Sequence, residues 1–289
     1  MKNALSRMTT GEPVFLRNLT LYPVGLASSN GAEVASVDEV LRDELGEFRE
    51  LDTPRVDEIE FDNRSDKPVL MLDGEEITGS LQNRIIAAST YVEPHSARSI
   101  GVICAEEDRW DKLGAFTTGC CSYPGVRAIL SGRGRRKDGL QQTVWDEIER
   151  KLTVTRTRSA TSSMHDIYDN LEDEVGRYVE GFHGLNHNTI GFIGVAGGKI
   201  LGCDVFAGPA TYRKYESRLL RSYALDAIEH RRPDTVRHDA RRFFDKIRQG
   251  LANKRFSRRS HHFTLKGRGF SGQGIHDQAG IVHLSAFPG

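Results

Sequence analysis

The sequence predicts an α+β fold with a mostly antiparallel, sandwich-like β core and helices in the middle and late parts of the chain. Three observations support this prediction. The first third alternates short apolar runs with polar turns closed by proline, which is typical of antiparallel strands. The middle third has apolar residues at four-residue intervals, which indicates helices. The last third contains two apolar runs joined by Gly197 and Gly198, and a glycine pair readily forms a tight hairpin turn.

Strands and one short helix are expected in the first third. Residues 14–22 end in an alternating pattern, and we expect this strand to stop at Pro23. Residues 36–45 form an amphipathic helix in which Ser36 is the N-cap and Glu39 completes a capping box. Further strands are expected at residues 59–61, 69–72, 83–92 and 98–104.

Helices and a hairpin are expected in the rest of the chain. Residues 140–152 and 164–182 show helical periodicity. The hairpin joins residues 189–196 to residues 199–206. Further helices are expected over residues 209–227 and 234–251, and terminal strands over residues 262–266 and 280–285.

The glycine-rich runs at residues 267–269 and 272–274 match neither a P-loop nor a dinucleotide-binding fingerprint, so we interpret both as turns. For the domain organisation, we expect a β-rich segment with polar site motifs over residues 1–125. Residues 126–289 would add a helical insert, the hairpin, further helices and terminal strands, packed with the first segment into one compact unit.

The composition is typical of a folded protein of the cytoplasm. Its 289 residues are 38% hydrophobic and 28% charged, which excludes a disordered chain and a disulfide scaffold. No apolar run reaches the roughly 18–20 residues of a membrane span, so we expect no membrane partner. The four cysteines form no CxxC pair and are expected to be reduced thiols. We expect no cofactor and assign no metal ligands, because a zinc site would need these cysteines to combine with distant histidines.

Charge is unevenly spread, although the formal net charge is zero. Residues 31–62 hold twelve acidic residues against three arginines, and residues 231–268 hold thirteen basic residues against three aspartates. The basic stretch favours a phosphate or nucleic-acid surface. Alternatively, it is a solvated helix and loop that pairs with the acidic segment of the same chain.

One short polar segment is the first candidate for a ligand site. It contains Glu75, Glu76, Gln82, Asn83 and Arg84. A carboxylate here could act as a general base or bind a ribose hydroxyl, and Arg84 could hold a phosphate or carboxylate. Adjacent residues of a strand point to opposite faces, so both glutamates serve one site only if a loop or bulge turns one of them. The alternative is a turn at a sheet edge whose charges are solvated or paired internally.

A second polar segment follows the strand expected at residues 98–104, at a strand end where sites are often built. Its candidate ligand-binding residues are Glu106, Arg109 and Trp110. A cation beside a flat ring could bind a nucleobase, although Trp110 could equally be a core anchor. Cys104 has no neighbouring histidine and is expected to be a buried, inert thiol.

Asp204 lies among apolar neighbours at the end of the expected hairpin, and a buried carboxylate needs a partner. Arg221 or Tyr223 on the following helix would supply it, and this pairing is either structural or part of a site. His283 is alone on an apolar strand, which is typical of a satisfied core histidine.

Several motifs together resemble the signature of the ARG and rhodanese-phosphatase-superfamily-associated protein domain, a prokaryotic family. The resemblance covers most of the chain from about Leu19. Its motifs are residues 72–76, 82–84, 104–106, 109–110, 202–206, 220–224 and 282–287. Glu107 and Asp108 depart from the Gln-Gly pair of the family, which affects the chemistry of that loop.

The resemblance implies a bacterial protein related to nucleotides, because the family's name records an association with ADP-ribosylglycohydrolases. It implies binding or hydrolysis of ADP-ribose-like or other nucleotide derivatives. Glu75 or Glu76 would be the acid or base, residues 82–84 would orient the ligand, and Trp110 would stack on a base.

A hypothesis of a different class is a non-enzymatic binding or scaffold module, which uses the basic carboxyl-terminal stretch to hold a nucleic acid or an acidic partner. The sequence leaves open whether the chain is an enzyme, which substrate it takes and how it assembles.

Overall fold

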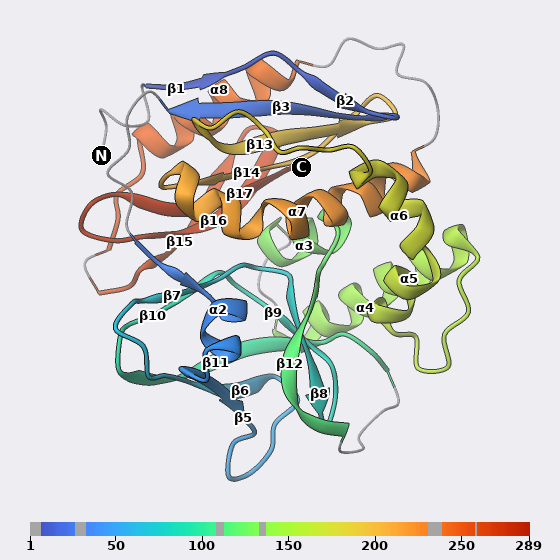
Figure 1. Cartoon of the computed structure of the whole chain (residues 1–289), viewed down its shortest axis with the longest axis vertical. Helices are drawn as coiled ribbons and strands as arrows, with labels where there is room; N and C mark the ends of the chain where they lie inside the picture. The colour runs from blue at the N-terminus through green and yellow to red at the C-terminus, as the bar shows by residue number, and fades with distance from the viewer. Residues whose placement is uncertain (1–6, 27–32, 108–112, 133–136, 231–238, 258) are drawn as a thin grey trace. The chain divides into compact units, whose positions relative to one another are not determined.

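The computed structural model describes residues 7–26, 33–107, 113–132, 137–230, 239–257 and 259–289 (Figure 1). The chain divides into two compact units, each built from segments that are distant in sequence. Unit 1 consists of Met1–Ala32, Tyr123–Gly132 and Asp173–Gly289, and unit 2 consists of Glu33–Ser122 and Arg133–Glu172. Both units contain antiparallel strand pairs, and the helices lie mainly in the middle and late parts of the chain. The predicted α+β fold class is therefore confirmed.

Unit 1 is built on an eight-stranded antiparallel sheet with the order β1-β3-β13-β14-β17-β16-β15, in which β2 also pairs with β3. Its strands are β1 (Met8–Thr10), β2 (Val14–Leu16), β3 (Leu19–Leu26), β13 (Thr189–Ala196), β14 (Lys199–Phe206), β15 (His262–Gly267), β16 (Phe270–His276) and β17 (Ile281–Pro288). The predicted hairpin of β13 and β14 is confirmed. Its turn residues, Gly197 and Gly198, have φ angles of 53° and 82°, which glycine adopts without steric cost.

β3 corrects one prediction, because Pro23 lies inside the strand and does not end it. A proline in a strand lacks only the N–H donor, and its carbonyl can still accept. The Pro23 carbonyl accepts a hydrogen bond from the Gly11 N–H at 2.8 Å, and Pro23 keeps its register with Phe192 of β13. The strand therefore continues to Leu26.

β16 corrects a second prediction, because Gly272 and Gly274 lie inside this strand and not in a turn. A Cβ atom at Gly272 would overlap the Ser285 carbonyl oxygen, and one at Gly274 would overlap the His283 carbonyl oxygen. The two glycines therefore permit the close approach of β16 to β17, a role that composition does not distinguish from a turn.

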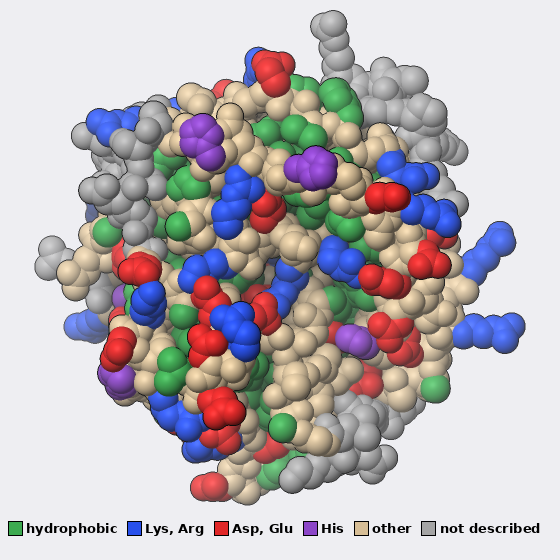
Figure 2. All heavy atoms as spheres, viewed as in Figure 1, with side chains coloured by type: hydrophobic (Ala, Val, Ile, Leu, Met, Phe, Trp, Pro, Cys, Tyr) green, Lys and Arg blue, Asp and Glu red, His purple; other side chains and the backbone are tan. Residues whose placement is uncertain are grey.

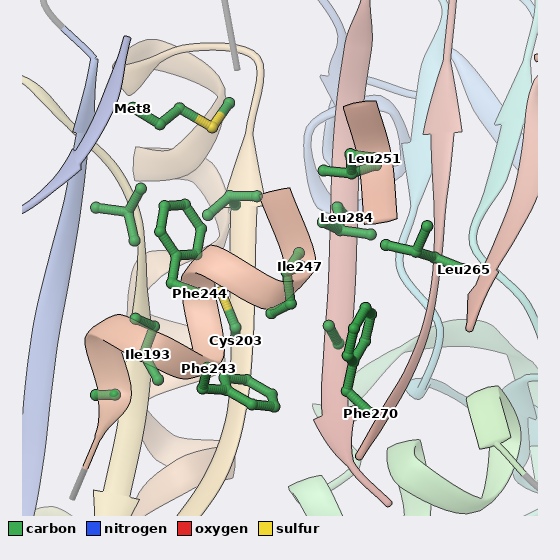
Figure 3. Close-up of a cluster of buried hydrophobic side chains, with 14 of the residues drawn as sticks. Met8, Ile193, Cys203, Phe243, Phe244, Ile247, Leu251, Leu265, Phe270 and Leu284 are labelled. Carbon is green, nitrogen blue, oxygen red and sulfur yellow. The ribbon is translucent and has the colours of Figure 1, made fainter. Parts of the chain in front are cut away.

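One face of this sheet is covered by α8 (Ala240–Ala252). Apolar side chains of the helix, including Phe243 and Ile247, pack against sheet residues that include Ile193 and Cys203 (Figure 3). All of these side chains are buried. Because successive side chains of a strand point to opposite faces, this cluster uses alternate positions of β13 and β14.

The other set of alternate side chains faces α7 (Pro209–Glu229), and α3 (Pro124–Gly132) also packs against β14, β16 and β17. The rings of Phe192 and Tyr223 meet edge to face, with centroids 4.9 Å apart and an angle of 70° between the planes. Such aromatic pairs stabilise by about 0.5–1.5 kcal/mol beyond the burial of their surface. The sheet of unit 1 is thus packed between helices on both faces.

Unit 2 contains a six-stranded sheet with the order β12-β8-β9-β11-β6-β5 and a three-stranded sheet with the order β10-β7-β4. Its strands are β4 (Ala35–Ser36), β5 (Gly46–Arg49), β6 (Glu58–Asn63), β7 (Val69–Met71), β8 (Glu75–Ser80), β9 (Arg84–Ile86), β10 (Thr90–Val92), β11 (Ser96–Cys104) and β12 (Leu113–Cys121). One buried cluster, with Phe61, Met71 and Ile86 among its members, joins the two sheets into a common core.

The helices of unit 2 include α2 (Val37–Arg42), α4 (Lys137–Thr155) and α5 (Met164–Asn170). The predicted capping box of α2 is confirmed, since Ser36 and Glu39 exchange side-chain hydrogen bonds with each other's backbone N–H. α4 confirms the helix expected at residues 140–152.

Three predicted elements are each divided in the structure. The strand expected over residues 14–22 is divided into β2 and β3, which pair with each other. The helix expected over residues 164–182 is interrupted at Leu171, where α5 ends and α6 (Glu172–Val179) follows. The strand expected over residues 83–92 is divided into β9 and β10, which pair in different sheets. Within the part of the chain described, no helix has both the length and the apolar character needed to cross a membrane.

The close contact at β16 predicts that Gly274→Ala destabilises unit 1 by about 1–3 kcal/mol, because an added methyl group would force β16 and β17 apart. Gly25→Ala in β3 is the matched control, since its Cβ would meet only ordinary contacts at 3.7 Å or more. Thermal unfolding midpoints would compare the two variants. Equal midpoints for both would contradict the role assigned to Gly274.

Candidate functional site

The two adjacent glutamates of β8 point in different directions. The Glu75 carboxylate accepts a hydrogen bond from the Leu72 N–H at 2.8 Å, which closes the turn before the strand. The Glu76 carboxylate instead accepts from His165 of α5, at 2.8 Å from Nδ1. Both glutamates are buried, at 1% exposure. This divergence is what strand alternation requires, and it directs Glu76 toward His165 and Cys120.

Glu76, Cys120 and His165 form a compact cluster in unit 2. The Cys120 thiol and the Cys120 N–H both donate to Glu76 Oε2, at 3.2 Å and 3.3 Å. One polar atom from each of the three side chains lies within 4.8 Å of the other two. The second carboxylate oxygen, Glu76 Oε1, is buried and has no hydrogen-bond partner among the described residues.

A β-bulge brings Cys120 to Glu76. In the β8–β12 pairing, Ile77 lies opposite Thr118 and Glu75 lies opposite Cys121, with a register shift between these two pairs. Two residues of β12 therefore oppose Glu76 alone, and a bulge of this kind re-aims a side chain. One of the two is Gly119, where a Cβ atom would overlap Glu76 Oε2.

His165 reaches the cluster from a distant segment. It is the second residue of α5, and its backbone N–H donates to Ser163, the N-cap, at 3.1 Å. Its other ring nitrogen, Nε2, lies 3.7 Å from Asp169 one helical turn later. Cys120 and His165 were not among the site residues predicted from the sequence. The β8–β12 pairing brings Cys120 to Glu76, and the long-range packing of α5 against β12 brings His165.

The charge state of the cluster follows from these contacts. The hydrogen bond to Glu76 raises the pKa of His165 to about 9, against the opposing effect of burial. Burial first, and then the charge of Glu76, raise the pKa of the Cys120 thiol well above its usual range. At neutral pH the cluster therefore contains an imidazolium and a neutral thiol, which does not fit a nucleophilic cysteine.

The residues predicted at the β8–β9 turn and after β11 do meet in space. Gln82 Nε2 donates to the Glu106 carbonyl at 3.0 Å, and the Glu106 carboxylate accepts from the Asn83 N–H at 2.7 Å. The buried thiol of Cys104 donates to Gln82 Oε1 at 2.7 Å. These hydrogen bonds thus connect the β8–β9 turn, which contains Gln82 and Asn83, to Glu106 just beyond the end of β11.

Arg84 is fully buried, and its guanidinium lies 3.4 Å from the Glu50 carboxylate. Glu50 Oε1 also accepts a hydrogen bond from the Ser80 hydroxyl at 3.0 Å. Glu50 Oε2 is buried and has no hydrogen-bond partner among the described residues. Glu50 and Ser80 line a groove of about 1010 Å³ in unit 2. Residues of α2, β5 and β12 also line this groove, together with Pro54, which follows β5.

Asp204 belongs to unit 1 and is paired inside its sheet. Its carboxylate accepts from Arg127 of α3 at 2.6 Å and 2.9 Å, from the Tyr223 hydroxyl at 2.8 Å, and lies 3.2 Å from His283 Nε2. Burial opposes its ionisation, but the charge of Arg127 and the hydrogen bond with His283 outweigh burial and hold the pKa of Asp204 well below its usual range. Arg221 is half-buried on α7, two residues before Tyr223.

Two predicted ligand-binding residues, Arg109 and Trp110, lie outside the described residues. The basic carboxyl-terminal stretch is described in part. On α8, Arg248 lies 3.3 Å from Asp245, three residues before it. On the face shown in Figure 2, basic and acidic side chains are interspersed. A nucleic-acid partner for this stretch stays a prediction.

The Glu76–His165 contact predicts a His165 pKa near 9 in chelator-treated protein, measured by an NMR titration of the imidazole. Because this folded-state pKa exceeds the ordinary value of 6.5, the pair stabilises fully below about pH 6.5 and its contribution disappears as the pH rises through about 9. In Glu76→Gln the His165 pKa should fall toward the ordinary value. An unchanged His165 pKa in that variant would refute the pairing.

The Asp204 contacts predict a structural role. Asp204→Asn should destabilise unit 1 by about 3–5 kcal/mol, because it leaves the buried Arg127 charge without its carboxylate. Asp245→Asn is the control, since that carboxylate is 58% exposed in its pair with Arg248 and should cost at most about 1 kcal/mol. Thermal unfolding measures both, and an Asp204→Asn variant as stable as the control would contradict this role.

Comparison with known proteins identifies the family. A family model described as the ARG and Rhodanese-Phosphatase-superfamily-associated Protein domain matches residues 7–287. No curated protein and no solved structure matches the chain. The match covers nearly all of the 289 residues and agrees with the motifs that suggested the resemblance. The chain therefore belongs to the ARG and Rhodanese-Phosphatase-superfamily-associated Protein (ARPP-1) domain family.

Proposed function

We propose that this chain binds a nucleotide derivative of the ADP-ribose type in the groove of unit 2 and hydrolyses it. The family name records an association with ARG, which the sequence resemblance connects with ADP-ribosylglycohydrolases. The observation that carries the proposal is the lining of the groove, which combines arginines, phenylalanines and the unsatisfied Glu50 carboxylate oxygen.

The Glu50 carboxylate would bind the sugar. A buried acceptor without a donor costs roughly 1–3 kcal/mol, so a ligand hydroxyl that donates to Glu50 Oε2 would recover this cost. Glu50 is 16% exposed and is held on its other oxygen by Ser80 and Arg84. Its orientation is therefore set before a ligand arrives, and Oε2 is left to accept from one hydroxyl of a ribose.

The arginines that line the groove would bind the phosphates. Arg42, Arg49 and Arg64 are exposed and are paired with acidic residues at 3.1 Å, 2.6 Å and 3.1 Å. Exposed pairs of this kind contribute little to stability, because solvent screens them. A phosphate can therefore compete for these guanidinium groups, and arginine binds phosphate oxygens in a bidentate geometry.

Phe48 and Phe116 would contact the apolar part of the ligand. Their ring centroids are 6.1 Å apart, at an angle of 64° between the planes. Phe48 is buried and Phe116 is half-buried, so the Phe116 ring presents apolar surface to the groove. A nucleobase stacks favourably on such a surface.

Glu76 is the carboxylate that could take part in hydrolysis. The groove is lined by β12 as far as Thr118, and Cys120 follows two residues later in the same strand. A ligand held in the groove can therefore extend toward the cluster. Glu75 points away from this cluster and accepts a hydrogen bond from the Leu72 N–H.

A thermal-shift experiment tests the proposal with ADP-ribose, AMP, ribose 5-phosphate and a short RNA. ADP-ribose at a hundred times its Kd should stabilise the protein by about 2.7 kcal/mol. The shift should be lost in Glu50→Gln and reduced in Arg49→Gln.

Arg55→Gln is the matched control, because Arg55 is as exposed as Arg49 and is also paired with a neighbouring carboxylate, but does not line the groove. No shift with any nucleotide would overturn the proposal. A shift with RNA alone, unaffected by Glu50→Gln, would favour the scaffold hypothesis.

A further inference from the structure

We propose that Glu76, Cys120 and His165 bind a divalent transition-metal ion of the zinc class. The site lies wholly within unit 2, and its residues come from β8, β12 and α5. The inference is independent of nucleotide binding in the groove, because it depends only on the three side chains and their surroundings.

The separation of the donor atoms fits a tetrahedral ion. Bonds of about 2.0–2.3 Å from zinc to oxygen, nitrogen and sulfur place neighbouring ligand atoms roughly 3.3–3.8 Å apart. In this structure Glu76 Oε2 lies 2.8 Å from His165 Nδ1 and 3.2 Å from Cys120 Sγ, and all three atoms lie within 4.8 Å of one another. Small side-chain rotations therefore suffice to replace these hydrogen bonds with metal bonds.

The donor types select the kind of ion. A thiolate and an imidazole are ligands of zinc and similar transition metals, whereas magnesium and calcium prefer oxygen ligands alone. Three protein ligands of mixed sulfur, nitrogen and oxygen type leave a fourth position open, which is typical of catalytic zinc sites. Among the described residues, Glu76, Cys120 and His165 are the group of potential metal ligands whose donor atoms all lie within 4.8 Å of one another.

A further observation points to a ligand at this site. Glu76 Oε1 is fully buried and has no hydrogen-bond partner among the described residues, although a buried carboxylate oxygen without a partner is costly. Gly119 permits the close approach of the carboxylate to β12, because a Cβ atom there would overlap Glu76 Oε2. A bound cation would neutralise the buried carboxylate and satisfy its oxygens.

The surroundings also orient the imidazole. With Nδ1 on the metal, the Nε2–H of His165 faces Asp169, whose carboxylate lies 3.7 Å away. A carboxylate on the second nitrogen of a metal-bound histidine fixes its tautomer and its direction. The open side of the site is also accessible, since His165 is 37% exposed.

Zinc titration of the full-length, chelator-treated protein by calorimetry tests the proposal without any nucleotide. We expect one ion per chain with a Kd of about 1 µM or below. His165→Gln should weaken zinc binding at least tenfold. Because His165 is partly exposed, the variant should stay folded, and circular dichroism would check this. His95→Gln is the matched control, because His95 is also exposed and paired with a carboxylate in unit 2.

Cobalt substitution identifies the sulfur ligand. The Co²⁺-loaded protein should show a thiolate-to-cobalt charge-transfer band that is lost in Cys120→Ser and kept in Cys104→Ser, whose hydroxyl can still donate to Gln82. Absence of stoichiometric zinc binding would overturn the proposal and leave the cluster as an ion pair. A charge-transfer band that persists in Cys120→Ser would overturn it as well. Glu50→Gln should leave both readouts unchanged, so failure of nucleotide binding and failure of metal binding are distinguishable.

Discussion

The buried carboxylate of Glu76 is the constraint on which the proposed chemistry of unit 2 depends. A buried charge is stable only when hydrogen bonds or opposite charges compensate it. Glu76 Oε2 accepts hydrogen bonds from His165, the Cys120 thiol and the Cys120 N–H. Glu76 Oε1 has no hydrogen-bond partner among the described residues. Unit 1 meets the same requirement differently. There Asp204 receives Arg127, Tyr223 and His283 on both of its oxygens. The complete set of partners supports the structural role of Asp204, and the incomplete set is the observation behind the metal site that we propose at Glu76.

The fold creates this site through a local irregularity in regular pairing. Had β12 paired with β8 without a shift, strand alternation would have determined a different facing residue for Glu76. The extra residue in β12 instead places Cys120 and Gly119 together opposite one glutamate. The residues of β12 that precede the bulge, up to Thr118, line the groove, which also contains arginines and phenylalanines. One strand of unit 2 therefore connects a groove suited to a nucleotide with a cluster suited to a metal ion.

Local patterns in the sequence were sufficient to predict the local structure. The capping box of Ser36 and Glu39 and the hairpin at Gly197 and Gly198 involve neighbouring residues, and both are present. Glu76 was among the candidate site residues predicted from the sequence. Strand alternation also predicted that the side chains of Glu75 and Glu76 would point to opposite faces. Contacts between distant residues were not predictable. His165 lies 89 positions from Glu76 and Arg127 lies 77 positions from Asp204, and neither pairing follows from periodicity or from charge spacing. The same limit applies to the interleaving of the two units along the chain, which arises from tertiary contacts.

X-ray absorption at the zinc edge of the zinc-loaded protein is the most direct measurement of the central claim, that Cys120, His165 and Glu76 bind a metal ion together. The account predicts one sulfur neighbour at about 2.3 Å, with nitrogen and oxygen neighbours at about 2.0–2.2 Å completing four-coordination. The sulfur contribution should vanish in Cys120→Ser. A spectrum with nitrogen and oxygen neighbours alone in the unmodified protein would contradict the account, because zinc would then be bound elsewhere and the buried carboxylate of Glu76 would serve only its ion pair with His165.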